Sequence, residues 1–302
     1  MTTEKKNLAA SVHQRLYNYA KANGEDFNLL LVRFANERWL YRLSISTHKN
    51  RFLLKGASLF TLWFNVPHRP TRDIDLLGFG SNEIVGIEKA FTEICQIKAD
   101  DGLEFRPETI KGSEIKEGEE YQGVRVSFLA LLGNARISLQ VDVGFGDAVT
   151  PKATSVAFPT VLDFPAPKLK AYPKETVVAE KFEAMVKLGM LNSRMKDFWD
   201  LRLMVSEFEF DGAIVQAAIQ ATFARRQTAF PTQAPLALTD EFSNDKGKQT
   251  QWSAFLRKNR LDNSKGLSEV IDLLRAFFLP IIESTQEGRE FAAQWLSGKW
   301  ED

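Results

Sequence analysis

The pattern of apolar and polar residues first predicts two helices, over residues 11–22 and 26–44, separated by Asn23 and Gly24. In the second segment, apolar side chains recur every three or four residues, as on the buried face of a helix. Shorter apolar stretches follow, and they predict a strand in "RFLLK", a helix in "SLFTLWF", a strand in "DIDLLGF" and a helix over residues 82–97. The beginning of the chain therefore mixes helices with short strands.

Three longer stretches then carry the apolar alternation of strands: "LEFRPETI", "YQGVRVSFLALLG" and "ARISLQVDVGF". Gly133 and Asn134 separate the last two and predict a hairpin turn. Residues 148–172 contain several prolines, and we expect a crossover there with little regular structure.

From Pro173 onward the pattern is helical, opening with a proline suited to a helix start. The predicted helices are "PKETVVAEKFEAMVKLGM", "SRMKDFWDLRLMVSEF", "DGAIVQAAIQATFARR", "KQTQWSAFLRKN", "LSEVIDLLRAFFLPIIEST" and "EGREFAAQWLSG". The sequence thus predicts an α+β protein with a mixed-sheet domain over residues 1–172 and a helical domain over residues 173–302.

Composition narrows the class of protein. The 39 basic residues balance 39 acidic ones, which argues against binding a polyanion over the whole surface but permits a local basic groove. The single cysteine, Cys95, excludes an intrachain disulfide and a cysteine-based zinc cluster. The N-terminus lacks the apolar core of a signal peptide, and no apolar run approaches the roughly 20 residues that span a bilayer. We expect a cytoplasmic protein without a membrane partner.

Three acidic residues lie inside apolar strands. Asp73 and Asp75 are two apart, so a strand would place both carboxylates on one face, where they repel unless a cation such as Mg²⁺ lies between them. The alternative is an exposed strand start with solvated acids. Asp142 is costly within "LQVDVGF" unless it is paired or bound to metal. As a third carboxylate it would deprotonate an attacking hydroxyl or hold a second metal ion.

The stretch "KGAS" predicts a strand-to-helix turn. Gly56 would let backbone N–H groups approach a ligand, Ser58 adds a hydroxyl, and the start of the next helix favours phosphate. The alternative is a tight turn with a helix cap and no ligand.

A charged helical region follows Pro173. Asp197 and Asp200 are three apart and share a helix face, where they could position a lysine that neutralises a triphosphate. Its charged residues are Glu180, Lys181, Arg194, Lys196, Asp197 and Asp200. Ordinary surface ion pairs are the alternative.

Taken in order, "KGAS", "TRDID", "VDV" and "EK…RMKDFWD" resemble the AbiEii/AbiGii family of nucleotidyltransferase-like toxins, to which the MenT toxins are related. The pair of acids after a small-residue turn is shared by the whole polymerase-β-like nucleotidyltransferase superfamily, and the helical element narrows the resemblance. It covers residues 28–203. The resemblance implies a nucleotidyltransferase-like domain whose nucleotide site is completed by the helical domain.

The resemblance also implies roles for individual residues. Asp73, Asp75 and Asp142 would be catalytic metal ligands, with Asp142 the general base, while Lys181 and Asp197 would belong to the catalytic set contributed by the helices. The residues implied in nucleotide binding are Lys55, Gly56, Ser58, Thr71, Arg72, Glu180, Arg194, Lys196 and Asp200. One departure is Ala57, where many family members have a second glycine.

The implied activity is the Mg²⁺- or Mn²⁺-dependent transfer of a nucleoside monophosphate from an NTP to an acceptor, notably tRNA, with release of pyrophosphate. Such an enzyme would be the toxin of a toxin–antitoxin or phage-defence pair, with its antitoxin encoded nearby. A metal-dependent phosphohydrolase or nuclease using the same acids is one alternative. A nucleotide-binding module without turnover is another, because one scaffold hosts many functions.

Basic residues beside aromatic ones mark a possible RNA surface in the C-terminal half. Such residues suit phosphate contact and base stacking. They are Arg225, Arg226, Lys246, Lys248, Arg257, Lys258 and Arg260, with Trp252 and Phe255 among them. The alternative is a solvated helix face whose aromatic residues belong to the core.

Overall fold

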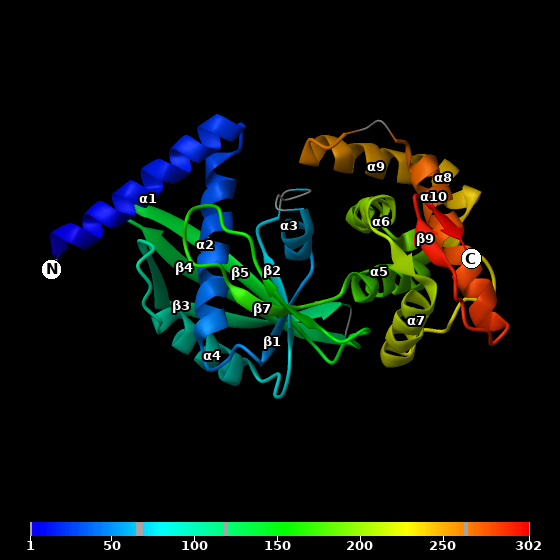
Figure 1. Ribbon diagram of the computed structural model, residues 1–302, viewed down its shortest axis with the longest axis horizontal. Coiled ribbons are helices and arrows are strands. Elements are labelled where there is room, and N and C mark those ends of the chain that lie inside the picture. The colour runs from blue at the N-terminus through cyan, green and yellow to red at the C-terminus, as the bar shows by residue number, and fades with distance from the viewer. Residues whose placement is uncertain (1, 65–68, 70, 118–119, 263–264, 302) are drawn as a thin grey trace. The chain divides into compact units, whose positions relative to one another are not determined.

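The computed structural model describes residues 2–64, 69, 71–117, 120–262 and 265–301. The chain forms two compact units (Figure 1): the first unit comprises residues 1–146 and 154–172, and the second comprises residues 147–153 and 173–302. The separate roles expected for residues 1–172 and 173–302 remain predictions.

A seven-stranded mixed sheet forms the centre of the first unit, with the strand order β3-β4-β5-β2-β1-β7-β6. Its strands are β1 (Phe52–Lys55), β2 (Ile74–Gly78), β3 (Leu103–Glu117), β4 (Glu120–Leu132), β5 (Ala135–Phe145), β6 (Thr154–Ala157) and β7 (Lys168–Ala171). Strand β2 is parallel to β5 and antiparallel to β1, and β1 is parallel to β7. The predicted α+β fold with a mixed sheet is therefore confirmed.

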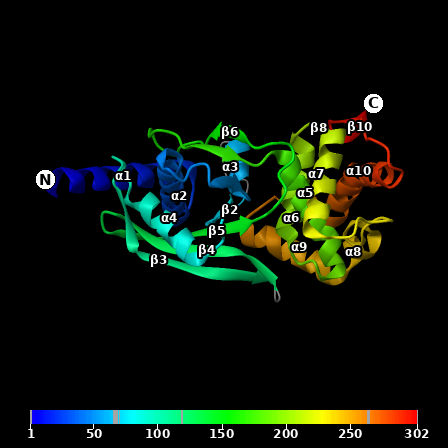
Figure 2. The ribbon, with the colours of Figure 1, turned by 90° about the horizontal axis from the view of Figure 1, so that it is seen from below.

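The helices that the structure describes in this unit are α1 (Thr2–Asn23), α2 (Phe27–Ile45), α3 (Ser58–Phe64) and α4 (Ile84–Gln96). The carboxylate of Asp26 accepts a hydrogen bond of 2.9 Å from the backbone N–H of Leu29 and so caps the start of α2. Helices α2 and α4 lie on the same side of strands β3, β4 and β5 (Figure 2). This side of the sheet carries the core.

The alternation predicted for β4 and β5 separates two faces of the sheet. Val124 and Val126 on β4 are buried, as is Val141 on β5, whereas Arg125 is exposed and Asp142 half-buried. The valines face the core, and the charged residues between them face the opposite side. Charged side chains that could bind a ligand therefore lie on this second face.

The crossover over residues 148–172 contains more regular structure than its prolines predicted. Strands β6 and β7 pair there, and Ala171 of β7 pairs with Leu54 of β1. Leu169 and Ala171 are buried while Lys168 and Lys170 are exposed, which is the alternation of an edge-region strand. The prolines precede and follow the strands, so they do not interrupt the ladder. Strand β3 likewise continues beyond residue 110, the end expected from sequence.

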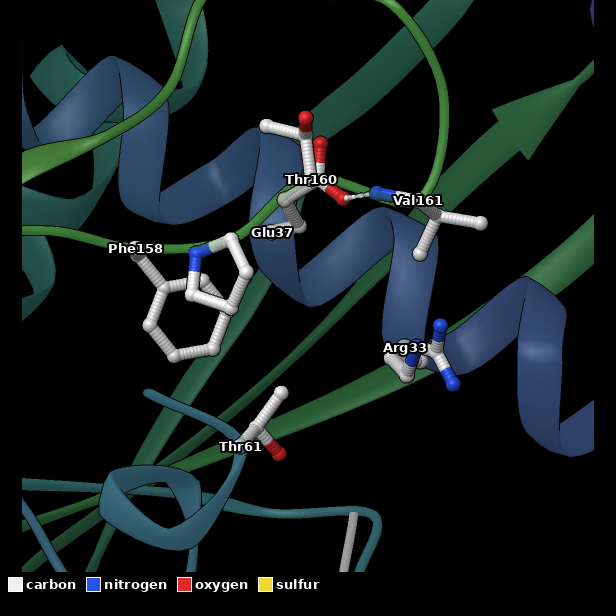
Figure 3. A pocket seen from close by; sticks show the side chains of 7 residues that line it. Arg33, Glu37, Thr61, Phe158, Thr160 and Val161 are labelled. Carbon is white, nitrogen blue, oxygen red and sulfur yellow. Dashed lines mark hydrogen bonds between the residues drawn. The ribbon is translucent and has the colours of Figure 1, made fainter. Parts of the chain in front are cut away.

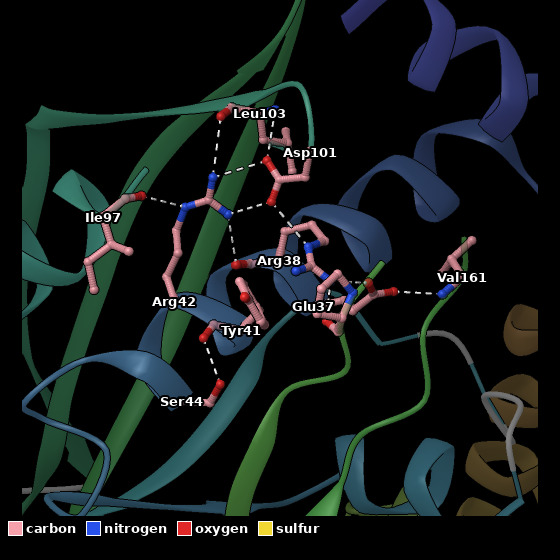
Figure 4. Close-up of polar contacts among 10 residues, drawn as sticks. Glu37, Arg38, Tyr41, Arg42, Ser44, Ile97, Asp101, Leu103 and Val161 are labelled. Atoms are coloured by element: carbon pink, nitrogen blue, oxygen red, sulfur yellow. Dashed lines mark hydrogen bonds and ion pairs between the residues drawn. The ribbon is translucent and has the colours of Figure 1, made fainter. Parts of the chain in front are cut away.

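A network of buried charges supports α2 in the first unit (Figure 4). Asp101 accepts hydrogen bonds from Nε of Arg38 at 3.1 Å and from Nη1 and Nη2 of Arg42 at 2.7 and 3.0 Å. Arg38 also donates to Glu37 at 3.1 Å, and Glu37 accepts a hydrogen bond of 2.7 Å from the backbone N–H of Val161. We call Glu37, Arg38, Arg42 and Asp101 the buried charge network, because each is at most 2% exposed.

The second unit is mainly helical, as predicted. Its helices are α5 (Lys174–Leu188), the 3₁₀ turn η1 (Gly189–Leu191), α6 (Met195–Glu207), α7 (Gly212–Arg226), the 3₁₀ turn η2 (Leu236–Leu238), α8 (Asp240–Asn244), α9 (Lys246–Asn259) and α10 (Leu267–Gln286). Phe182 of α5 stacks on Phe278 of α10 with ring centroids 4.2 Å apart. Aromatic packing of this kind joins the helices into one core.

The helix predicted over residues 287–298 is wrong. This segment instead forms β9 (Gln294–Leu296), which pairs with β8 (Phe210–Asp211) and β10 (Lys299–Glu301). Gly288 and Gly298 adopt positive φ angles of 68° and 85°, and glycine favours such turns over helix. The indole N–H of the buried Trp295 donates to the backbone carbonyl of Val205 at 2.7 Å, which anchors the strand.

None of the helices in the described residues combines the length and apolar character that a segment crossing a membrane needs.

Candidate active site

Four charged residues form one row across four neighbouring strands of the first unit. Lys55 on β1 is the register partner of Asp75 on β2, Asp75 is the partner of Asp142 on β5, and Asp142 is the partner of Arg125 on β4. Register partners present their side chains on the same face of a sheet. We call these four residues the charged row, and its signs run positive, negative, negative, positive.

The turn before α3 lies directly against the charged row. Gly56 has a φ of 69°, and a Cβ atom placed on it would lie 1.9 Å from Oδ2 of Asp75. Only glycine therefore fits here, both for its backbone conformation and for the space it leaves. The turn predicted for "KGAS" is therefore present, and its backbone lies against the carboxylate of Asp75. The methyl group of Ala57 is buried.

Arg125 binds Asp142 through a two-pronged ion pair. Its Nε atom donates to Oδ1 at 2.9 Å, and Nη2 donates to Oδ2 at 2.8 Å. The hydrogen bond to Asp142 raises the pKa of Arg125, and the charges of Asp142, Asp73 and Asp75 raise it further. Asp142 was expected to be paired or metal-bound, and in this structure it is paired.

The segment that enters β2 is held by α2. Oγ1 of Thr71 donates to the backbone carbonyl of Asp73 at 3.5 Å, and Nδ2 of Asn36 donates to the carbonyl of Arg72 at 2.9 Å. Asp73 and Asp75 are half-buried and Arg72 is exposed. The two acids therefore do not lie on a freely solvated strand end. Ser58, the first residue of α3, is only 8% exposed.

The carboxylates of this face suit a hard divalent cation. Mg²⁺ takes one or two protein carboxylates and draws its remaining ligands from water and substrate phosphates, and Asp75 and Asp142 supply two carboxylates in register. Among the described residues, no three carboxylate, imidazole or thiolate side chains are gathered closely enough to hold a metal ion. The residues therefore fit a metal site that rests on two protein carboxylates and needs further ligands from a substrate.

The charged helical residues form a separate cluster in the second unit. Nζ of Lys181 on α5 donates to Asp197 at 2.6 Å and to Asp200 at 2.9 Å, both on α6. Asp197 and Asp200 are fully buried, so the alternative of ordinary surface ion pairs is wrong for these two residues. Burial opposes the charge on Lys181, but the two carboxylates raise the pKa of its ammonium group. Arg194 lies 2.7 Å from Asp197, while Lys196 is exposed.

Glu180 belongs to a second ionic cluster of the same unit. Arg226, at the end of α7, lies 3.6 Å from Glu180 and donates to Glu183 at 2.8 Å and to Asp147 at 3.2 Å. Burial opposes the guanidinium charge of Arg226, but these acids raise its pKa further above its usual range. Arg226 thus has a structural role, which removes it from the basic residues expected to meet RNA.

Two more members of the predicted RNA surface are structural. Lys248 is 6% exposed and donates to the backbone carbonyl of Asn192 at 2.9 Å. Trp252 is 3% exposed, and its indole N–H donates to the carbonyl of Lys265 at 3.3 Å. The alternative reading of these aromatic residues, as part of the core, is therefore correct for Trp252. The exposed basic residues that remain are Arg225, Lys246, Arg257, Lys258 and Arg260.

A small pocket lies in the first unit (Figure 3). It is lined by Arg33, Glu37, Thr61 and residues 158–161, and none of these was predicted to bind nucleotide. The carboxylate of Glu37, which lines this pocket, accepts a hydrogen bond from the backbone N–H of Val161.

Sequence reasoning missed Arg125 and Asn36. The signal for Arg125 was present, because the hairpin turn at Gly133–Asn134 fixes the register that places Arg125 opposite Asp142. No such signal existed for Asn36, whose partner Arg72 is reached only when α2 packs beside the start of β2.

Comparison with known proteins gives a family and a fold. A family profile described as "Nucleotidyl transferase AbiEii toxin, Type IV TA system" matches residues 38–276. The fold is similar to that of MenT4, a nucleotidyltransferase toxin from Mycobacterium tuberculosis H37Rv, with a TM-score of 0.53 and 16% identity over 92% of this chain and 99% of that one. JHP933 from Helicobacter pylori matches with a TM-score of 0.46 and 12% identity over 83% of this chain and 90% of that one. A comparison with curated proteins found no match.

The family profile covers most of the chain, including the charged row and the cluster of Lys181, Asp197 and Asp200. The chain therefore belongs to the AbiEii family of nucleotidyltransferase toxins from type IV toxin–antitoxin systems.

Proposed function

We propose that this toxin transfers a nucleoside monophosphate from an NTP to a hydroxyl group at the end of an RNA, with tRNA as the acceptor, and releases pyrophosphate. The observation that carries the proposal is the charged row, in which Asp75 and Asp142 lie in register with a cation at each end and with Gly56 against Asp75. Two carboxylates beside a turn that contains a glycine form an arrangement suited to holding a metal-bound triphosphate.

In this proposal the first unit binds the reacting phosphates. Asp75 and Asp142 are the metal ligands that lie in register, Asp73 would join them only once substrate and metal are bound, and Mg²⁺ or Mn²⁺ would supply positive charge against the phosphate oxygens when bound. Asp142 accepts the proton of the attacking hydroxyl. Lys55 and Gly56 orient the phosphates through a positive charge and a backbone that a ligand can approach closely.

A further set of residues is proposed to take part in nucleotide binding. Thr71 and Arg72 precede the first acid in the chain, and Ser58 follows Gly56. In the second unit, Asp197 and Asp200 keep the amine of Lys181 protonated and in a fixed position, as their short contacts favour. Arg194 and the exposed Lys196 add positive charge that favours binding of the outer phosphates. Glu180, which directly precedes Lys181 in the chain, is one of the acidic residues of this set.

Modification of tRNA would stop translation, which makes the enzyme toxic to its own cell and useful against phage. We propose that it works in the cytoplasm, where NTPs and tRNA are found, and that an antitoxin encoded nearby neutralises it. The type IV assignment of the family supports such a partner. The exposed Lys246, Arg257 and Lys258 on α9 offer positive charge for RNA phosphates.

The test is to incubate the purified protein with total tRNA, Mg²⁺ and each α-labelled NTP in turn. The wild type should transfer label to RNA with at least one NTP. Asp75→Asn keeps the size of the side chain but removes its charge, and we expect at least a hundredfold loss of labelling because charge stabilisation of the transferring phosphate is lost. Asp100→Asn, at an exposed position outside the charged row, makes the same change and should keep full activity.

RNA that shortens without gaining label would contradict the proposal and establish a nuclease. Nucleotide binding without transfer to tRNA or to any other RNA would also contradict it and point to a binding module. Asp75→Asn with activity equal to that of Asp100→Asn would remove the charged row from the mechanism.

A further inference from the structure

We propose that Arg125 neutralises Asp142 in the nucleotide-free enzyme and releases it to a divalent cation when an NTP binds, so that metal ion and triphosphate bind cooperatively. This inference rests on the proposed function, in which Asp142 is a metal ligand. It adds a residue that controls when the site accepts metal.

The first step is the geometry of the pair. Both oxygens of Asp142 accept a hydrogen bond from Arg125, at 2.9 and 2.8 Å. The guanidinium therefore lies on the side of the carboxylate where two-pronged ligands bind. The amide of Gln140, with its oxygen toward the guanidinium, accepts from the same two nitrogen atoms at 3.1 and 3.2 Å and adds a neutral partner.

The second step is competition for Asp142. A dication bound to this carboxylate would lie within a few ångströms of the guanidinium charge, and two cations at that distance repel. Arg125 thus weakens the attraction of Asp142 for a metal ion.

The third step is that the pair can open. The side chain of Arg125 is 44% exposed and that of Asp142 is 20% exposed, so water can solvate both groups once they separate. Val124 and Val126, on either side of Arg125, face the core, so the strand itself does not need to move. A rotation of the arginine side chain is sufficient.

The fourth step links the opening to the nucleotide. A guanidinium that leaves Asp142 needs a new anionic partner, and a triphosphate offers oxygen atoms that arginine binds in the same two-pronged way. Metal bound to Asp142 and phosphate bound to Arg125 therefore favour each other. By linkage, each ligand must then strengthen the binding of the other by the same factor.

The first experiment titrates the full-length protein with Mn²⁺ and follows free Mn²⁺ by electron paramagnetic resonance. Arg125→Gln should bind Mn²⁺ about tenfold more tightly than the wild type without nucleotide, because the competing charge is gone. Arg125→Lys keeps the charge but loses the two-pronged pair, and its affinity should lie between the two. Arg136→Gln removes an exposed charge from the same face of β5 as Asp142 and should match the wild type.

The second experiment measures cooperativity. Binding of the non-hydrolysable α,β-methylene analogues of the four common NTPs is followed by calorimetry with and without Mn²⁺. The factor by which Mn²⁺ tightens nucleotide binding should fall about tenfold in Arg125→Gln. An unchanged factor together with unchanged Mn²⁺ affinity would overturn the inference and leave Arg125 as a structural residue.

Asp142→Asn separates this failure from failure of the proposed function. If Asp142→Asn weakens Mn²⁺ binding while Arg125→Gln leaves it unchanged, the exchange is refuted and the metal site stands. If Asp142→Asn has no effect on Mn²⁺ binding even when combined with Arg125→Gln, the metal site itself is refuted, and the exchange with it. Circular dichroism of each variant checks that the fold is retained.

Discussion

Two aspartates of the first unit are each bound by arginine, yet their surroundings differ. Asp101 in the buried charge network is 1% exposed and accepts from Arg38 and Arg42, which are almost equally buried. Asp142 in the charged row accepts a two-pronged pair from Arg125, but the two side chains are 20% and 44% exposed. The chemistry of the pairs is alike, and burial decides whether a pair is a fixed part of the fold or can exchange for a ligand.

The largest effect expected from this comparison is on stability. Asp101→Asn leaves the guanidinium of Arg42 buried without a counter-charge and leaves Arg38 with Glu37 alone, and we expect it to lower the free energy of unfolding by about 3–5 kcal/mol. Asp142→Asn should cost no more than about 1 kcal/mol, since Arg125 can turn into water. Urea denaturation of both variants measures the difference. Equal losses would show that burial does not separate the two pairs.

A smaller effect is expected on the pH dependence of the free energy of unfolding, and it arises from Glu37 in the buried charge network. Burial raises the pKa of Glu37 from 4.5 to about 7, outweighing its bonds to Val161 and Arg38. The folded protein therefore binds this proton more tightly than the unfolded chain, so the contribution to stability is present at acid pH and is lost as pH rises from about 5 to 7.

Glu37→Gln removes this titration. The unfolding free energy of the variant minus that of the wild type should increase with pH across this range, by at most about 1.4 kcal/mol per pH unit. Urea denaturation at several pH values between 5 and 8 measures the difference. A difference that stays constant across the range would show that Glu37 titrates near its ordinary pKa.

The smallest effect is expected at Arg125. Arg125→Gln should lower the free energy of unfolding by roughly 0.2–1 kcal/mol, and this loss should shrink at high salt because the pair is partly exposed. Thermal and urea denaturation at low and high NaCl measure it. A loss as large as that of Asp101→Asn would place Arg125 among the fixed structural ions and would argue against its exchange for a metal ion.

The sequence predicted the elements that carry the first unit because their patterns are local. The alternation of valines with charged residues was sufficient to predict strands β4 and β5, and the turn at Gly133 and Asn134 was sufficient to predict that they pair. The helical pattern of residues 287–298 gave a wrong prediction, because the hydrogen bond of the buried Trp295 to the carbonyl of Val205 and the strand pairing override it. A contact between distant segments determines that outcome, and propensity does not contain it.

Some features of the candidate site could likewise be predicted from the sequence, and others could not. The spacing of Asp197 and Asp200 predicted that they share a helix face, but it did not predict that both are buried, because their burial depends on how α5 packs against α6. The role of Asn36, whose amide holds the carbonyl of Arg72, depends likewise on contact between remote segments.

The hairpin of β4 and β5 also bears on how this protein can evolve. Arg125 and Asp142 face each other only because equal lengths of strand separate each of them from the turn. One residue inserted into or deleted from either arm would send one of the two toward the valine core, unless a bulge absorbed the change. We therefore expect insertions in related toxins to collect at the tip of this hairpin, and the lengths of its arms to be inherited unchanged even where their side chains vary.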